Sequence, residues 1–217
     1  MNSLPPIDTW LIDLDHTIYD ADKGVIARMS RLMAIFISDL LHIPMEEADV
    51  LRKDYWEKYG STLHGLMTEH KVDPRAFLEY THDFDISDVA SCPTLRESLE
   101  RLPGKKIIFT TAPRAFAERM TKHLGIEHCF DHIFTIEDSF YVPKPYPEPY
   151  LTIIEKFRFD PRRACMIDDK EENLKEADRL GMTTVWITGK DKDHARQNLP
   201  HVHHRAETLA DWLQSVI

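Results

Sequence analysis

Carboxylate, hydroxyl and ammonium side chains follow short apolar stretches of this 217-residue sequence. The set consists of Asp13, Asp15, Thr110, Thr111, Lys144, Asp168 and Asp169. Carboxylates hold divalent metal ions, and hydroxyl and ammonium groups hold phosphoryl oxygens. A lone Asp-x-Asp pair would carry little weight, because acidic residues are common on protein surfaces. The joint placement of the set predicts a site for a phosphate group and a metal ion.

The apolar stretches beside these residues have the length and composition of buried strands. We predict strands over residues 9–15, 106–111, 132–136, 164–168 and 183–188. Helical patterns separate most of them, for example over residues 114–124 and 171–180. This alternation is typical of an α/β fold with a doubly wound parallel sheet. Ligands bind such sheets at the carboxyl ends of the strands, which is where the polar set falls.

About ninety residues without a convincing strand separate the first predicted strand from the second. Apolar residues there repeat at helical spacing along Ile26, Met29, Met33, Phe36 and Leu40. We therefore expect a mainly helical insertion over residues 23–87, and a catalytic core made of residues 1–22 and 88–217.

Two further segments have a predicted shape. The helical pattern of the insertion is interrupted at Tyr59, Gly60, His64 and Gly65. This interruption indicates either a loop over the site or a helix–helix turn. Residues 207–217 are expected to form a closing amphipathic helix. Its inward-facing residues would be Leu209, Trp212, Leu213 and Val216.

Four short motifs occur in order along the chain. They are DLDHT at 13–17, FTTA at 109–112, KPYPEPY at 144–150 and MIDDKEEN at 166–173. Their residues, order and spacing resemble the four motifs of phosphatases of the haloacid dehalogenase (HAD) superfamily, which places a helical C1 cap where this chain has its insertion. The combination is most similar to the pyrimidine 5'-nucleotidase branch. Thr111 and Lys170 depart from that branch, which usually has Asn and Ser at these positions.

The resemblance implies a mechanism for the first and fourth motifs. Asp13 would attack phosphorus and form an aspartyl phosphate. Asp15 would protonate the leaving group and then activate the water that hydrolyses the intermediate. Mg²⁺ would be held by the Asp13 carboxylate, the Asp15 main-chain carbonyl and Asp169. Asp168 would support that metal shell without joining it.

The remaining motif residues are expected around the phosphoryl group. Thr110 and nearby backbone amides would hold its oxygens, and Lys144 would compensate the negative charge and orient Asp13. Thr111 either contacts the phosphate or makes a local backbone hydrogen bond. Asn173 either braces the metal-bound waters or caps the helix that follows.

Residues that flank the motifs have less definite roles. His16 is expected to face the insertion or the substrate, without a catalytic role. Arg114 either contacts the substrate or is a solvated residue at the start of a helix. The three histidines near the C-terminal end have no matching ligands within sequence reach, so we do not expect them to bind a metal. They are His201, His203 and His204.

Composition excludes several partners. The formal net charge is −10, from 27 basic and 37 acidic residues, and the sequence has no basic stripe, so we expect no nucleic acid polymer as a partner. Apolar runs are shorter than the ~20 residues that a membrane span needs, so we expect no membrane and a cytoplasmic location. Cys92, Cys129 and Cys165 are widely spaced, which indicates neither a disulfide framework nor a thiolate zinc site.

The expected function is a Mg²⁺-dependent phosphatase that hydrolyses a small phosphomonoester, by resemblance a nucleoside 5'-monophosphate. A phosphosugar phosphatase, a phosphoglycolate phosphatase and a phosphomutase with the same Asp13 phosphoenzyme stay open. A dehalogenase is disfavoured, because its chemistry does not need an acid at Asp15. Receiver-like phospho-acceptor domains are about half this length, and the intact residues Asp13, Asp15, Lys144 and Asp169 argue against an inactive scaffold.

Overall fold

The computed structural model describes residues 5–22, 24–190 and 198–217. This part of the chain forms a six-stranded sheet in the order β3-β2-β1-β4-β5-β6, and every pair is parallel. The strands are β1 (Thr9–Ile12), β2 (Lys105–Phe109), β3 (His132–Phe134), β4 (Ala164–Asp168), β5 (Thr183–Ile187) and β6 (His204–Ala206). The predicted doubly wound parallel sheet is therefore confirmed. The chain winds outward from β1 to β3 and then returns to β4, so the order reverses between β1 and β4, where such sheets bind ligands.

The structure differs from the predicted strands by one added strand and at several ends, since β2 and β3 each end two residues earlier than predicted. β1 ends at Ile12, so Asp13 and Asp15 lie in the loop after the strand and not within it. β6 was missed, because His204, Arg205 and Ala206 form a three-residue, half-buried strand without an apolar run. It extends the sheet beyond β5.

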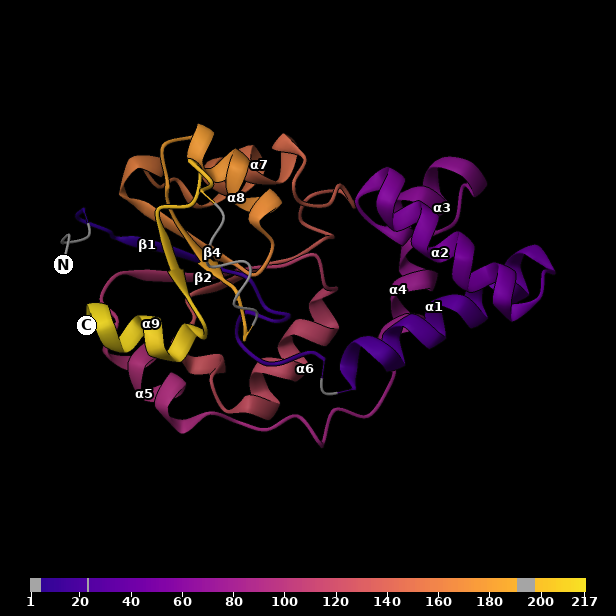
Figure 1. Cartoon of the computed structure of the whole chain (residues 1–217), viewed down its shortest axis with the longest axis horizontal. Helices are drawn as coiled ribbons and strands as arrows, with labels where there is room; N and C mark the ends of the chain where they lie inside the picture. Colours follow the sequence, from indigo (N-terminus) through magenta and orange to yellow (C-terminus); the bar gives the residue numbers. More distant parts are fainter. Residues whose placement is uncertain (1–4, 23, 191–197) are drawn as a thin grey trace.

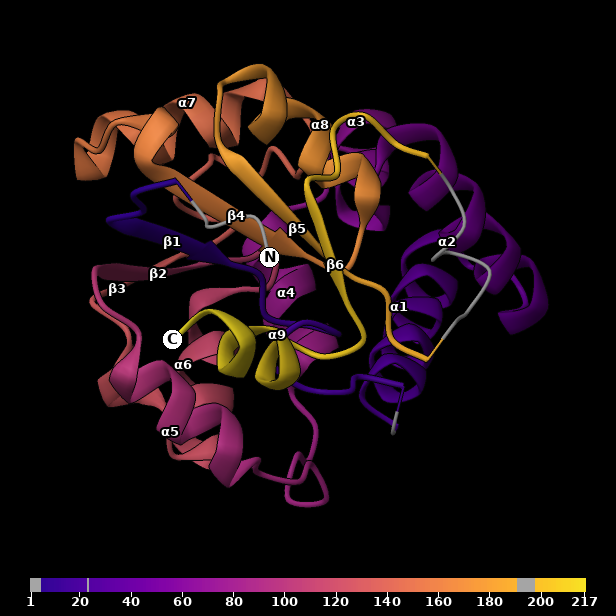
Figure 2. The ribbon, with the colours of Figure 1, turned by 60° about the vertical axis from the view of Figure 1, so that its left-hand side comes forward.

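Helices cover both faces of the sheet (Figures 1 and 2). One face carries α5 (Pro93–Arg101), α6 (Arg114–Leu124) and α9 (Leu209–Val216), and the other carries α7 (Pro147–Phe157) and α8 (Glu171–Arg179). Short 3₁₀ turns lie at Glu127–Cys129 and Pro161–Arg163. Because side chains alternate along a strand, Trp10 and Ile12 pack under the first group while Leu11 packs under the second.

The segment between β1 and α5 is helical, and its helices lie together to one side of the sheet (Figure 1). They are α1 (Val25–Leu41), α2 (Met45–Tyr59), α3 (Thr62–His70) and α4 (Pro74–His82). They share a hydrophobic cluster of their own, which includes Ile37, Tyr55, Leu66 and Phe77. Ile136, from the loop after β3, packs into the same cluster and joins it to the sheet.

The buried faces of two helices differ from the sequence pattern. In α1 the buried residues are Val25, Ala34 and Ile37, whereas Leu40 is exposed. The reason is that Val25 packs on the core beside the sheet, whereas Ile37 packs within the helical insertion. In α9 the three predicted residues Leu209, Trp212 and Leu213 are buried, but Val216 is exposed.

All three cysteines are free thiols, of which Cys129 and Cys165 are buried and Cys92 is exposed. Among the described residues, no helix is long and apolar enough to cross a membrane.

The connection between α2 and α3 is a tight helix–helix turn. Gly60 ends α2 with a φ of 75°, and Ser61 begins α3 by accepting a hydrogen bond from the backbone N–H of His64. Gly65, one turn into α3, lies directly against α2. A Cβ atom at Gly65 would lie 2.6 Å from Cβ of Tyr55 and 2.9 Å from Cδ2 of Tyr59. Glycine is therefore needed here for the close approach of the two helices.

We predict that Gly65→Ala destabilises the protein by about 1–3 kcal/mol, because the added methyl group overpacks the contact with Tyr55. This sign is opposite to that of helix propensity, which favours alanine by about 1 kcal/mol. Urea unfolding followed by circular dichroism measures the change. Thr68→Ala, on the exposed side of the same helix, is the matched control and should stay within about 0.5 kcal/mol of wild type. A Gly65→Ala protein as stable as this control would contradict the packing.

Candidate active site

Hydrogen bonds to neighbouring strands fix the first residue after β1 and the first residue after β2. The N–H of Asp13 donates to the carbonyl of Ile167 at 2.9 Å, and the N–H of Thr110 donates to the carbonyl of Phe134 at 3.0 Å. Asp168 is the last residue of β4. Directly after Asp15 the chain turns at His16, whose φ of 58° lies in the left-handed region. Asp13 and Asp15 both line the same cavity.

Lys144 is the centre of the buried polar cluster. Its Nζ donates to Oδ1 of Asp13 at 2.7 Å, to Oδ2 of Asp168 at 2.6 Å and to the carbonyl of Phe109 at 2.9 Å. These three acceptors match the three N–H groups of an ammonium. Burial alone would favour neutral Lys144, but the two carboxylates raise its pKa above the ordinary value, so the side chain stays cationic.

Asp168 is held on both carboxylate oxygens. Oδ2 accepts from Lys144, and Oδ1 accepts from Nδ2 of Asn173 at 2.8 Å and from the N–H of Lys170 at 2.9 Å. The carbonyl of Asn173 in turn accepts from the hydroxyl of Tyr150 at 2.7 Å. Asp168 is fully buried and does not line the cavity, whereas its neighbour Asp169 does.

Asp15 has a partner that the sequence did not reveal. The hydroxyl of Tyr19 donates to Oδ1 of Asp15. Burial raises the pKa of Asp15, and this hydrogen bond, together with the charges of His16 and Lys170, offsets part of the rise. A tyrosine four residues after Asp15 gave no motif signal, since the contact depends on the turn that follows β1.

The cluster contains more carboxyl groups than ammonium groups. Asp13, Asp168 and Asp169 each offer an oxygen within 4.8 Å of the others. Burial raises the pKa of Asp13 to about 7, with a further contribution from repulsion by Asp168 and Asp15, although the Lys144 ammonium opposes the rise. Burial and repulsion from Asp168 and Asp13 raise the pKa of Asp169 to about 8. A donor set made of three carboxyl groups, which can ionise when a cation binds, fits Mg²⁺.

A cavity of about 350 Å³ lies over this cluster and is shared between the sheet and the helical insertion. Asp13, Asp15, His16, Thr111, Lys144, Asp169, Lys170 and Asn173 line it from the sheet side. Met29, Met33, Arg52, Trp56, Phe77, Leu78 and His82 are among the residues that line it from the insertion. The turn at Gly60 and Ser61 also lines it, so this helix–helix turn faces the site.

The two threonines after β2 have different surroundings. The hydroxyl oxygen of Thr110 accepts a hydrogen bond from the N–H of Ala112 at 3.0 Å, and Thr110 is buried outside the cavity lining. Thr111 is exposed and lines the cavity. Of the two threonines, it is therefore Thr111 whose side chain lines the cavity.

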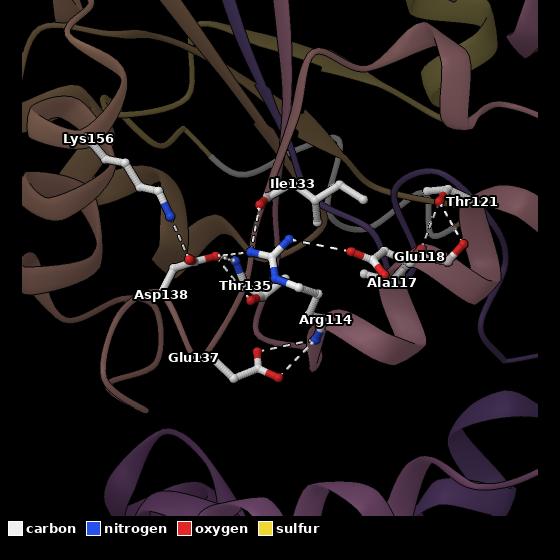
Figure 3. A network of polar contacts seen from close by, with 9 residues as sticks. All are labelled: Arg114, Ala117, Glu118, Thr121, Ile133, Thr135, Glu137, Asp138 and Lys156. Atoms are coloured by element: carbon white, nitrogen blue, oxygen red, sulfur yellow. Dashed lines mark hydrogen bonds and ion pairs between the residues drawn. The ribbon is translucent and has the colours of Figure 1, made fainter.

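Arg114 belongs to a separate polar network and does not line the cavity (Figure 3). Its guanidinium donates to the carbonyl of Ile133 and to Asp138, and its backbone N–H donates to the carboxylate of Glu137 at 3.0 Å. Asp138 also accepts from Lys156 at 2.6 Å. These contacts tie α6 and α7 to the loop after β3, which carries Ile136 into the insertion cluster.

Two of the histidines near the C-terminal end bond to neighbouring elements of the sheet layer. His201 pairs with Glu171, and Nδ1 of His203 accepts from the N–H of Thr184 at 3.0 Å. These bonds attach the segment before β6 to α8 and β5.

Comparison with known families identifies the chain. The family described as "Haloacid dehalogenase-like hydrolase" matches residues 10–187. The chain belongs to this family. It is therefore a HAD-like hydrolase, and the match spans β1 to β5 together with the helical insertion.

Individual proteins similar to this HAD-like hydrolase share about a quarter of its sequence or less. It is 26% identical to "Phosphate metabolism protein 8" of Saccharomyces cerevisiae over 98% of this chain and 71% of that protein. It is 25% identical to "Pyrophosphatase PpaX" of Bacillus cereus over 87% of each. A crystal structure of a HAD phosphatase from Thermococcus onnurineus superposes with a TM-score of 0.67 at 20% identity, covering 97% of this chain and 98% of that one.

We predict that the metal-free HAD-like hydrolase loses stability as the pH rises from 6 to 8. Asp169 has a folded pKa of about 8 against 3.8 for an unperturbed group, so the folded state retains a proton that the unfolded state has lost. Its stabilising contribution is full below about pH 4 and disappears as the pH approaches 8, since the folded state must then ionise a buried group.

Thermal unfolding in a chelator at pH 6, 7 and 8 measures this effect. Asp169→Asn should remove part of the pH dependence and stabilise the chain at pH 8 by on the order of 1 kcal/mol. Glu97→Gln, an exposed change on α5, should retain the wild-type slope. Equal slopes for all three proteins would show that Asp169 ionises normally.

Proposed function

We propose that this HAD-like hydrolase is a Mg²⁺-dependent phosphatase that forms an aspartyl phosphate on Asp13 and acts on a nucleoside 5'-monophosphate. The observation that carries the proposal is the buried Lys144 ammonium, which bonds Asp13 and Asp168 beneath a cavity that Asp15 and Asp169 also line. The family is that of hydrolases, and similar proteins are named as a pyrophosphatase and a HAD phosphatase.

Asp13 and Asp15 would share the chemistry. Lys144 holds one oxygen of Asp13, and the other oxygen attacks phosphorus while the ester oxygen leaves. Asp15 donates its proton to that leaving oxygen, and its raised pKa favours the protonated form that this step needs. Asp15 then takes a proton from the water that attacks the aspartyl phosphate, which releases phosphate and restores Asp13. Tyr19 fixes the orientation of Asp15 during both transfers.

Other residues of the cavity would bind the phosphoryl group and the metal. Thr111 lines the cavity and would donate its hydroxyl to a phosphoryl oxygen, while Lys144, whose three N–H groups are already bonded, would neutralise the phosphoryl charge. Thr110 would contribute through the backbone turn that its hydroxyl stabilises. The Asp13 and Asp169 carboxylates and the Asp15 main-chain carbonyl would hold Mg²⁺, which neutralises charge between the phosphoryl group and the carboxylates. Asp168 and Asn173 support this arrangement from behind, because Asp168 is bonded on both oxygens.

We further propose that residues 23–87 are a cap domain, and that residues 1–22 and 88–217 are the catalytic core. The insertion supplies one wall of the cavity, so it would exclude water and contact the leaving group. The cavity of about 350 Å³ and the net charge of −10 suit a small phosphomonoester better than a nucleic acid polymer. Asp15 and its Tyr19 partner favour phosphate ester hydrolysis over dehalogenation, which needs no proton donor there.

We predict that Asp13→Asn lowers kcat with p-nitrophenyl phosphate by at least about 10³-fold, because an amide cannot act as the nucleophile. Asp15→Asn should also be strongly impaired, yet it should accumulate phosphoenzyme with this good leaving group, since only the second step then needs the base. Acid-quench trapping with labelled substrate measures the phosphoenzyme, and circular dichroism checks that both variants fold. Activity of Asp13→Asn within tenfold of wild type would remove Asp13 from the mechanism.

We predict that Asp169→Asn raises the Mg²⁺ concentration for half-maximal activity more than Asp168→Asn does. Asp169 faces the cavity, whereas Asp168 is occupied by Lys144 and Asn173. Ca²⁺ should inhibit, because its looser coordination suits in-line attack by Asp13 poorly. Mg²⁺ titrations of activity and of melting temperature test the order of the two variants. The reverse order would assign the metal to Asp168.

A further inference from the structure

Trp56 of α2 is unusual among the four tryptophans of the chain. Its side chain is 50% exposed, whereas Trp10, Trp186 and Trp212 are buried. Trp56 lines the cavity, and Nζ of Lys170 lies 5.3 Å from the centroid of its ring. Because Lys170 directly follows Asp169, this contact places the indole face near the proposed metal ligand Asp169.

The wall that surrounds Trp56 is mostly apolar. The insertion contributes Ile26, Met29, Met33, Leu63, Phe77 and Leu78 to the cavity. Thioether and aliphatic side chains of this kind adapt to the surface of a flat ring. They provide no hydrogen bonds to hydroxyl groups or to a second phosphate.

Most polar groups of the insertion that line the cavity already bond within the insertion. The hydroxyl of Ser61 accepts from the N–H of His64 at 3.0 Å, and the hydroxyl of Thr62 donates to the carbonyl of Arg52 at 3.0 Å. The Arg52 guanidinium pairs with Asp49 at 2.9 Å. These contacts occupy part of the hydrogen-bonding capacity of the wall, so it offers few free polar groups to a leaving group rich in hydroxyls or anionic charge.

We infer that Trp56 forms the leaving-group subsite and stacks on a planar heteroaromatic ring, such as the nucleobase of a nucleoside 5'-monophosphate. The inference rests on the proposed function and specifies which part of the substrate the insertion recognises. In the free protein the indole face is covered by the Lys170 ammonium, as cations favour the face of an aromatic ring. A bound ring takes that place, and Lys170 moves toward the phosphate and the carboxylates beside it.

A matched pair of substrates tests the subsite. Uridine 5'-monophosphate and ribose 5-phosphate share the phosphorylated ribose and differ in the base. Trp56→Ala should lower kcat/KM for the nucleotide by about tenfold or more, as loss of aromatic stacking on a base does. It should change kcat/KM for ribose 5-phosphate less than about twofold, and Trp56→Phe should keep the nucleotide preference. Val50→Ala, an exposed change on the same helix outside the cavity lining, is the control for effects on α2.

Fluorescence tests binding without turnover. Since the other three tryptophans are buried, acrylamide quenching reports mainly on Trp56. In the Asp13→Asn protein with Mg²⁺, saturating uridine 5'-monophosphate should lower the quenching constant at least about twofold, whereas ribose 5-phosphate should leave it unchanged. The wild-type protein in a chelator should behave in the same way.

The outcomes separate this inference from the proposed function. Equal losses of kcat/KM for both substrates in Trp56→Ala, or quenching that the nucleotide leaves unchanged, would overturn the subsite even if the phosphatase activity stands. Protection of Trp56 by the nucleotide in a chain that hydrolyses no phosphomonoester would support the subsite and refute the proposed function.

Discussion

The buried ion cluster around Lys144 is the constraint on which the rest of the site depends. Its ammonium lies between Asp13 and Asp168, which follow or end the central strands β1 and β4, and it also bonds the last carbonyl of β2. Removing one partner from such a cluster leaves an uncompensated buried charge and typically costs about 3–5 kcal/mol. The cluster therefore locks three strand ends together, and it does so at the reversal of strand order, where a parallel sheet leaves room for a ligand.

The sheet and the insertion are joined by the loop after β3. Arg114, Asp138 and Lys156 fasten this loop to α6 and α7, and Ile136 carries it into the apolar cluster of the insertion (Figure 3). Arg114 thus acts at a distance from the cavity. Its polar contacts hold the loop on which the insertion packs. They therefore help to fix the position of the insertion relative to the sheet, and these two parts form the walls of the cavity.

Sequence reasoning succeeded where one local rule determines the outcome. Short apolar runs and helical spacing predicted the parallel sheet and the helical insertion. The structure brings Asp13, Asp168 and Lys144 of the motifs together, with Lys144 reaching the strand ends from the loop after β3. Sequence reasoning failed where the outcome depends on packing between distant segments. β6 has no apolar run of its own. In α1 the predicted inward residue Leu40 is exposed, whereas Ala34 is buried. The contact of Tyr19 with Asp15 forms across the turn that contains the left-handed residue His16. Trp56 and Lys170 were not connected, because 114 residues separate them.

The Lys170–Trp56 contact suggests how the chain separates chemistry from selection. Asp13, Asp15, Lys144 and Asp169 come from segments that follow the strands, and the parallel sheet fixes those segments. The cavity wall opposite them comes from helices whose side chains are apolar or bonded among themselves. Under the proposed function, a change in the wall would therefore alter which leaving group fits while the ion cluster stays intact. Lys170 connects the ion cluster with the cavity wall, since it follows Asp169 on the sheet side and lies over the indole of Trp56 from the insertion. If a substrate ring stacks on Trp56 as proposed, it would displace Lys170 and so change the charge distribution beside the carboxylates.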